Sequence, residues 1–219
     1  MNTKDKIKEY DLLQRVVNHL TVQNPVVHDL GLLNGKMGIA FFFYHYARYQ
    51  KESLYEVLAG NLIEEICDNL HDNMPVTIDK GLCGIAWGIC TLLEQDFLDG
   101  DADEVLNDID HKIMERDPMR MIDLSFRTGL EGIWCYVRTR LAFAEKEQTA
   151  RPFDNMYIYA LEKSVQRAGL PLKSVSPLDV ITPPQLNETT DILKLPLGLD
   201  GGCAGLALKH YTDEAYLSF

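Results

Sequence analysis

Several features that mark whole classes of protein are missing from this chain of 219 residues. No apolar run reaches the length that crosses a bilayer, and the N-terminal segment alternates charges instead of forming an apolar signal core. No stretch is dense in Lys and Arg, and the net charge of −12 would repel a phosphate backbone. We therefore expect no membrane partner, no nucleic-acid partner and a cytoplasmic location.

Cysteine and histidine pairs at the spacings of metal-binding or redox motifs are also missing. The five cysteines are odd in number and contain no Cys-x-x-Cys pair, which fits reduced thiols better than a disulfide framework. The six histidines are dispersed, with no His-x-x-x-His on one helix face. Strand-like alternation between turn signals is absent as well, so the expected fold class is all-α.

The chain contains one short motif four times, a Gly-x-x-Gly followed by apolar residues, which we call the repeat phrase. Successive copies start 46, 48 and 73 residues apart. Such recurrence indicates a repeated supersecondary unit. Because glycine lacks a Cβ, the pairs predict structural positions where backbones approach closely. These glycines are Gly35 and Gly38, Gly81 and Gly84, Gly129 and Gly132, and Gly202 and Gly205.

The segments around each phrase differ in their apolar pattern. The segment before a phrase carries one apolar face, whereas the segment after it is apolar on most sides, as in residues 39–47. The sequence thus predicts a single domain of residues 1–219 built from four helical hairpins, each an amphipathic helix followed by a buried one. The predicted units are roughly 1–50, 51–97, 98–145 and 146–219, the last with a proline-rich insertion near 169–198.

Two local patterns predict helix starts. Thr128-x-x-Glu131 has the form of a capping box that would open the third buried helix. Asp99, Asp101 and Asp103 resemble the opening of a calcium loop, but the turn glycine and the bidentate glutamate are missing. We interpret these aspartates as a solvated helix start.

The phrases Gly31-Leu32-Leu33-Asn34-Gly35-Lys36-Met37-Gly38-Ile39-Ala40 and Gly81-Leu82-Cys83-Gly84-Ile85-Ala86 resemble repeats of the lanthionine synthetase C-like family over nearly the whole chain. The resemblance implies an α/α toroid of nested inner and outer helices. Enzymes of that family add cysteine thiols to dehydrated Ser or Thr residues of a peptide, and zinc activates the thiol. Four hairpins are fewer than a closed ring of that family needs, so we expect an incomplete ring or arc.

The resemblance also says where zinc ligands would stand, namely just ahead of each Gly-x-x-Gly. Those places hold Leu33, Asp79, Arg127 and Asp200, and the residues directly before each first glycine are neither Cys nor His. A zinc thiolate site needs three protein ligands and an open position. We therefore predict no metal site and no cofactor, although the family carries zinc, and whether the protein is an enzyme stays open.

Five residues are candidates for a site near the repeat phrases. Asp79, Arg127 and Asp200 occupy equivalent places, so in a toroid they would face one end of the axis together and bind a polar ligand or a peptide. The alternative is that the two aspartates cap their helices and Arg127 pairs with one of them. Cys83 and Cys203 lie in the first turn of buried helices, where the helix N-terminus favours a thiolate, or they are small residues packed among glycines.

Two classes of function follow. The first is a scaffold or peptide-binding accessory in peptide modification, with a peptide or a partner modification enzyme as its ligand. The second is a toroid-fold enzyme, either a peptide thioether cyclase built on Cys83 and Cys203 or a glycosidase-like hydrolase with Asp79 and Asp200 as acid and base. An open arc exposes apolar faces at its end hairpins, so we also expect a homo-oligomer or a partner chain there.

Overall fold

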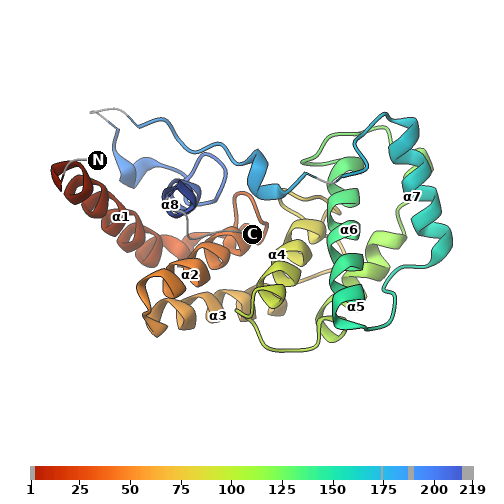
Figure 1. Cartoon of the computed structure of the whole chain (residues 1–219), viewed down its shortest axis with the longest axis horizontal. Coiled ribbons are helices and arrows are strands. Elements are labelled where there is room, and N and C mark those ends of the chain that lie inside the picture. The colour runs from red at the N-terminus through yellow and green to blue at the C-terminus, as the bar shows by residue number, and fades with distance from the viewer. Residues whose placement is uncertain (1–2, 174, 187–189, 214–219) are drawn as a thin grey trace. The chain divides into compact units, whose positions relative to one another are not determined.

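This computed structural model describes residues 3–173, 175–186 and 190–213 of the protein. Within these residues every regular element is a helix, so the all-α prediction is confirmed (Figure 1). None of the described helices combines the length and the apolar content needed to cross a bilayer. The α-helices are α1 (Thr3–Gln23), α2 (Lys36–Gln50), α3 (Ser53–Asp68), α4 (Leu82–Glu94), α5 (Ala102–Met114), α6 (Leu130–Glu147), α7 (Asn155–Arg167) and α8 (Cys203–Asp213). The short 3-10 helices are η1 (Asn24–Val26), η2 (Pro118–Arg120), η3 (Pro177–Val180) and η4 (Ile192–Lys194).

Buried and amphipathic helices alternate along the chain, as the sequence predicted. Helix α4 is buried continuously from Leu82 to Leu92, and α2 is buried from Lys36 to Ala47. By contrast, α3 buries only Ala59, Leu62 and Ile66. Each even-numbered helix begins at a Gly-x-x-Gly phrase, which ties the sequence repeat to the buried helices.

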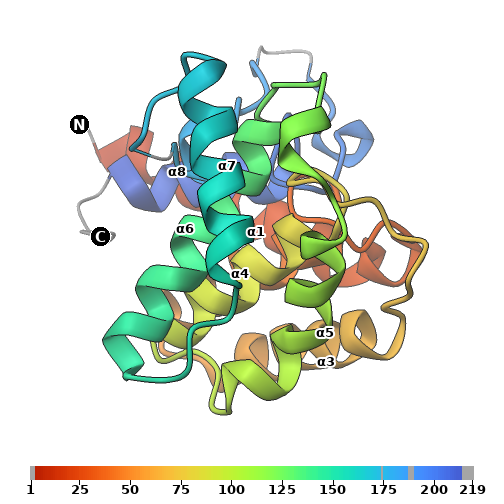
Figure 2. The same ribbon diagram turned by 90° about the vertical axis from the view of Figure 1, so that its right-hand side faces the viewer.

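The contacts divide the chain into two compact units. Unit 1 consists of residues 1–67 and 181–219, and unit 2 consists of residues 68–180. In unit 2 the buried helices α4 and α6 pack on each other, α5 packs on α4, and α7 packs on α6 (Figure 2). In unit 1 the buried helices α8 and α2 pack on each other and α1 packs on α8 (Figure 1).

Helix α3 completes unit 1 by packing against α2 through side chains. The ring of Tyr55 lies edge-on to Tyr46 with 4.6 Å between centroids, and the buried Lys36 forms an ion pair with Glu65. Each unit therefore contains two buried neighbours and one amphipathic helix on each of them. The two units share one architecture, in which α8, α1, α2 and α3 correspond to α4, α5, α6 and α7.

The helices contact more neighbours than the predicted hairpins name. Each amphipathic helix packs on the buried helix before it in the chain, α3 on α2, α5 on α4 and α7 on α6, and α5 also packs on α6 through Asp110 and Arg140. The remaining pair joins the two ends of the chain, because α1 packs on α8. The first and fourth repeats therefore lie side by side in unit 1.

Backbone carbonyls in the preceding loop satisfy the first N–H group of every buried helix. The N–H groups of Lys36, Leu82, Leu130 and Cys203 each donate to the carbonyl seven residues earlier, over 2.8 to 3.0 Å. The first turn of a helix has no intrahelical acceptor for these groups. The loop carbonyl thus replaces a side-chain cap. This replacement is needed because the N-cap residues Gly35, Gly81 and Gly129 make no side-chain hydrogen bond.

The same loop explains the glycines of the phrase. A Cβ at Gly38, Gly132 or Gly205 would overlap the carbonyl oxygen six residues earlier, which belongs to Leu32, Phe126 or Leu199 respectively. The first glycine of each phrase is equally crowded by backbone of its own loop. The close approach that the sequence predicted is therefore between a helix and the loop that leads into it.

The two predicted helix starts have different outcomes. Asp101 is the N-cap of α5 and accepts a hydrogen bond from the Asp103 N–H over 2.8 Å, which confirms a helix start there. The capping box at Thr128 is wrong, because the N-cap of α6 is Gly129. The Thr128 hydroxyl instead donates to Asp123 Oδ2 over 2.6 Å, inside the preceding loop.

The crowding at Gly38 predicts a large loss of stability for Gly38→Ala. We expect the free energy of unfolding to fall by about 3 kcal/mol, the upper end for overpacking, because the new methyl group meets rigid backbone. Gly60→Ala in α3 is the matched control, since its Cβ meets only Tyr44 Oη at 3.6 Å. This control should be neutral or stabilising by up to ~1 kcal/mol in urea unfolding followed by circular dichroism. Equal effects of the two substitutions would contradict the proposed role of Gly38.

Candidate functional site

The structure brings Asp79 and Arg127 together in unit 2 through their backbones. The N–H groups of Ile78 and Asp79 both donate to the Arg127 carbonyl, over 3.1 and 3.2 Å. The Asp79 carboxylate accepts from the Thr77 hydroxyl and from the Lys80 N–H, each over 2.7 Å. This carboxylate therefore holds its own loop and does not cap α4, whose N-cap is Gly81.

Asp200 belongs to unit 1, where its backbone makes the equivalent contact. Its N–H donates to the Leu33 carbonyl over 2.9 Å, and its Oδ1 accepts from the Thr182 N–H over 3.0 Å. Leu33 and Arg127 hold the same place in their repeats, as do Asp79 and Asp200. The four positions ahead of the phrases thus form loop-to-loop hydrogen bonds, one pair in each unit.

The two candidate thiols are fully buried. Burial raises the pKa of Cys83 far above its usual value, and burial raises that of Cys203 to about 11. The loss of hydration outweighs the helix N-terminus, which was expected to favour the thiolate. Cys203 Sγ lies 3.7 Å from the Ile192 carbonyl oxygen, as a weak donor in a packed core. Both cysteines match the alternative interpretation as small core residues.

The donor set does not fit a zinc centre. Within the described ranges, no three His, Cys, Asp or Glu side chains are grouped so that they could hold a metal ion. His45 is buried against Phe41 with 4.6 Å between ring centroids, and burial together with Arg48 lowers its pKa to about 3. A zinc ligand set of the kind that the family resemblance implies would need thiolates or imidazoles that converge.

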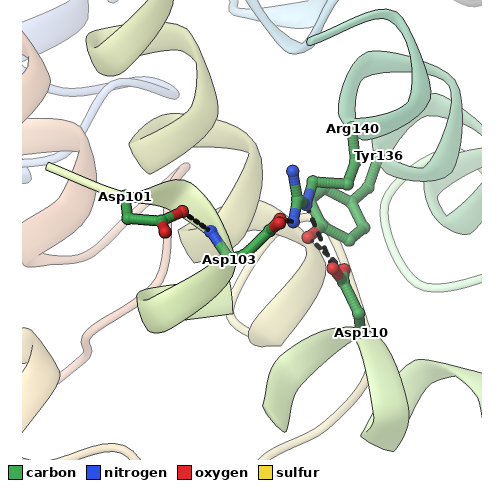
Figure 3. A network of polar contacts seen from close by, with 5 residues as sticks. All are labelled: Asp101, Asp103, Asp110, Tyr136 and Arg140. Atoms are coloured by element: carbon green, nitrogen blue, oxygen red, sulfur yellow. Dashed lines mark hydrogen bonds and ion pairs between the residues drawn. The ribbon is translucent and has the colours of Figure 1, made fainter. Parts of the chain in front are cut away.

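The sequence analysis missed a buried polar cluster between α5 and α6. Arg140 and Tyr136 point from α6 toward Asp110 and Asp103 of α5 (Figure 3). Tyr136 Oη donates to Asp110 Oδ1 over 2.5 Å, and Arg140 Nε donates to Asp110 Oδ2 over 3.0 Å. Arg140 also forms an ion pair with Asp103, which follows the N-cap Asp101.

Burial dominates the electrostatics of this cluster. Arg140 and Asp110 are each 1% exposed. Loss of hydration raises the pKa of Asp110 to about 6, and the hydrogen bonds from Tyr136 and Arg140 limit the rise. An arginine that is fully buried needs partners for its donors, which explains why two aspartates from one helix meet it. The bonds of Arg140 and Tyr136 to Asp110 run from α6 to α5, so the cluster joins these two helices.

One sequence signal could have found this cluster. Tyr136 and Arg140 are four residues apart on the apolar face of α6, and Asp110 follows Ile109 on the apolar side of α5. Residues four apart lie on one helix face. A charge and a hydroxyl on a buried face indicate an internal polar partner, although the sequence does not say which acidic residue supplies it.

A cavity of about 520 Å³ lies between α6 and α7 in unit 2. One side is a stripe of α6 at helical spacing, and the other side is the linker to α7 and the facing turns of that helix. Its floor includes the buried Trp134 and Ile158. The lining residues are Trp134, Arg138, Leu141, Ala142, Ala144, Glu145, Thr149, Arg151, Ile158 and Glu162.

The charged groups of this cavity are not neutralised by one another. Arg138, Arg151, Glu145 and Glu162 are exposed, and none of them forms an ion pair with another residue in the described part of the chain. The Arg138 guanidinium lies over the Trp134 ring, 5.5 Å from its centroid. The cavity therefore offers apolar surface, two guanidinium groups and two carboxylates to a ligand.

A second hollow, in unit 1, is lined by α1 and by the segment around η4. It encloses about 660 Å³ and is lined by Arg15, Asn18, His19, Val22, Gln23, Leu193, Leu195 and Leu197. No buried polar group without a partner lies along it among the residues described. The cavity between α6 and α7 is the better candidate because buried Trp134 Nε1 has no acceptor there.

Comparisons with known proteins do not assign a family. No family model matches this chain, and no curated protein matches it at a significant level. The lanthionine synthetase C-like resemblance thus rests on the repeat phrases and stays a prediction.

The raised pKa of Asp110 predicts how stability depends on pH. Its ordinary value of 3.8 rises to about 6 on folding, so the folded state holds the proton more tightly than the unfolded state. This contribution to stability therefore falls as the pH rises from about 4 to about 6. Relative to Asp110→Asn, the wild type should lose up to roughly 3 kcal/mol of unfolding free energy over that range.

The control for this measurement is Asp108→Asn, which changes an exposed carboxylate on the same helix. Urea unfolding at a series of pH values should give this variant the pH dependence of the wild type. If Asp110→Asn also followed the wild-type curve, the raised pKa of Asp110 would be contradicted.

Proposed function

We propose that this chain is a peptide-binding scaffold of the lanthionine synthetase C-like kind, acting in the cytoplasm as an accessory in peptide modification and not as a cyclase. The cavity between α6 and α7 carries this proposal. It combines an apolar floor with unpaired charges of both signs. A peptide presents apolar side chains, amides and charges together, which is the mixture that such a lining complements.

The state of the candidate catalytic residues supports a scaffold over an enzyme. A cyclase needs thiolates that can bind a metal, and burial holds the Cys83 and Cys203 thiols protonated. A hydrolase needs carboxylates free to exchange protons with a substrate, whereas Asp79 accepts a hydrogen bond from the Lys80 N–H and Asp200 from the Thr182 N–H. Neither form of the enzyme alternative therefore gains support from these residues.

The partners in this proposal are a peptide and a modification enzyme that acts on it. Association with a second copy of the chain stays a prediction. Exposed apolar side chains that could serve it lie on α3 and α7, and include Leu54, Val57, Met156 and Tyr159.

The first experiment concerns zinc. We expect protein purified from zinc-supplemented cultures to contain no stoichiometric zinc by elemental analysis, because burial keeps the candidate thiols protonated. Cys83→Ser and Cys203→Ser should then leave the metal content unchanged, as should the control Cys67→Ser at an exposed position. One zinc per chain that either core substitution removes, and the control does not, would restore the cyclase alternative.

The second experiment tests peptide binding at the cavity. Fluorescence anisotropy with a panel of labelled decapeptides of different charge should find members that bind. Ala142→Trp fills the cavity from an exposed lining position without changing any charge, and should weaken binding by roughly tenfold or more. Ala150→Trp, at an exposed position outside the lining, is the matched control and should bind as the wild type does. The proposal fails if no peptide of the panel binds, or if both variants bind equally.

A further inference from the structure

The arginines distinguish the cavity between α6 and α7 from an ordinary surface hollow. Arg138 is positioned by its stacking on Trp134, four residues earlier on the same face of α6. Arg151 lies in the linker that leads to α7, where its Nη1 donates to Asn155 Oδ1 over 2.8 Å. Both guanidinium groups are therefore held by neighbours that are not carboxylates. Each keeps N–H groups that can bind an anionic oxygen.

A comparison with Arg140 shows how differently two neighbouring arginines of α6 are placed. Arg140, two residues after Arg138, meets two aspartates and is buried. Arg138 instead remains exposed on a protein with 33 acidic and 21 basic residues, and it has no acidic partner among the described residues. An unpaired guanidinium held against an aromatic ring loses little freedom on binding, which favours a planar anionic ligand.

The buried group beside Arg138 points to the same chemistry. Trp134 is 2% exposed, and its Nε1 has no acceptor within the residues that the structure describes. An indole N–H is a donor only, so it needs an oxygen acceptor from a ligand or from water. A donor that is buried and unsatisfied costs free energy until it finds one. Trp134 also lines the cavity, so an unsatisfied donor and the Arg138 guanidinium belong to neighbouring side chains of its lining.

Two kinds of ligand could bring such an oxygen, a carboxylate or a phosphate. Glu145 and Glu162 line the same cavity. They repel a phosphate, whose double charge sits on one group, more strongly than a peptide whose carboxylates are spaced so that each can meet one arginine. The apolar lining residues Leu141 and Ile158 also favour a ligand that has apolar groups between its charges.

We infer that the cavity between α6 and α7 binds an acidic peptide segment. Arg138 and Arg151 hold its carboxylates, and Leu141 and Ile158 contact its apolar side chains. This inference rests on the proposed function and specifies the class of peptide that the scaffold takes.

The test uses Trp134 as a built-in reporter. The chain contains two tryptophans, so its indole N–H region has two NMR signals, which Trp87→Phe assigns. The probe is the peptide acetyl-Leu-Glu-Leu-Glu-Leu-amide, titrated into the full-length protein. We expect the Trp134 signal to shift in a saturable manner, and we expect the counterpart with Gln in place of Glu to bind at least tenfold more weakly. A counterpart with Lys, and inorganic phosphate alone, should leave the signal in place.

Arg138→Gln is the decisive variant, because it keeps a polar side chain of similar length and removes the charge. It should weaken binding of the Glu peptide by roughly tenfold or more, the loss expected for a hydrogen bond to a charged group. Arg116→Gln, at an exposed arginine outside the cavity, should bind as the wild type does. Because both side chains are exposed, unchanged circular dichroism spectra should show that both variants fold.

Several results would overturn this inference. They are equal binding of the Glu and Gln peptides, preference for the Lys peptide, a Trp134 shift with phosphate alone, or equal effects of the two arginine substitutions. In each case binding of other decapeptides that Ala142→Trp blocks would leave the proposed function standing. If no peptide of the panel binds, the proposed function itself fails.

Discussion

The structure depends on one contact that is made four times, between the first N–H groups of a buried helix and the carbonyls of the loop before it. A helix that starts inside a core cannot leave those groups to water, so it needs acceptors nearby. The loop supplies them from seven residues earlier, as Asp29 does for Lys36 and Pro75 for Leu82. The glycines follow from that geometry, because the returning carbonyl occupies the space of a Cβ.

Each unit contains two of these loop-to-helix contacts. The two loops of a unit are hydrogen-bonded to each other, through Asp79 and Arg127 in unit 2 and through Asp200 and Leu33 in unit 1, and the buried helices that follow them pack on each other. Both units follow the same plan, yet unit 1 takes its helices from the two ends of the chain, with α8 between α1 and α2. The hydrogen bonds of the loops therefore fix which buried helices become neighbours, and the amphipathic helices cover them from outside.

Burial then decides which side chains are available for chemistry. The candidate cysteines lie in the packed helix starts, where loss of hydration keeps their thiols protonated. The buried charges of Arg140 and Asp110 are used to join two helices. The cavity between α6 and α7 differs, because Trp134 Nε1 has no acceptor among the described residues and Arg138 forms no ion pair. This contrast is why we propose recognition of a ligand over reaction at the repeat phrases.

The sequence by itself determined the helical class, the alternation of buried and amphipathic helices, and the crowding at the Gly-x-x-Gly phrases. Those features are local, because the apolar period and the missing Cβ act within one helix and its own loop. Only the tertiary structure decided that α1 packs on α8, that Asp110 is the acid that meets Arg140, and that Arg138 and Arg151 line one cavity. Each of these contacts joins residues that are far apart in the chain or in different elements. The hydrophobic pattern predicts which face of a helix is buried, but it does not predict which element packs against that face.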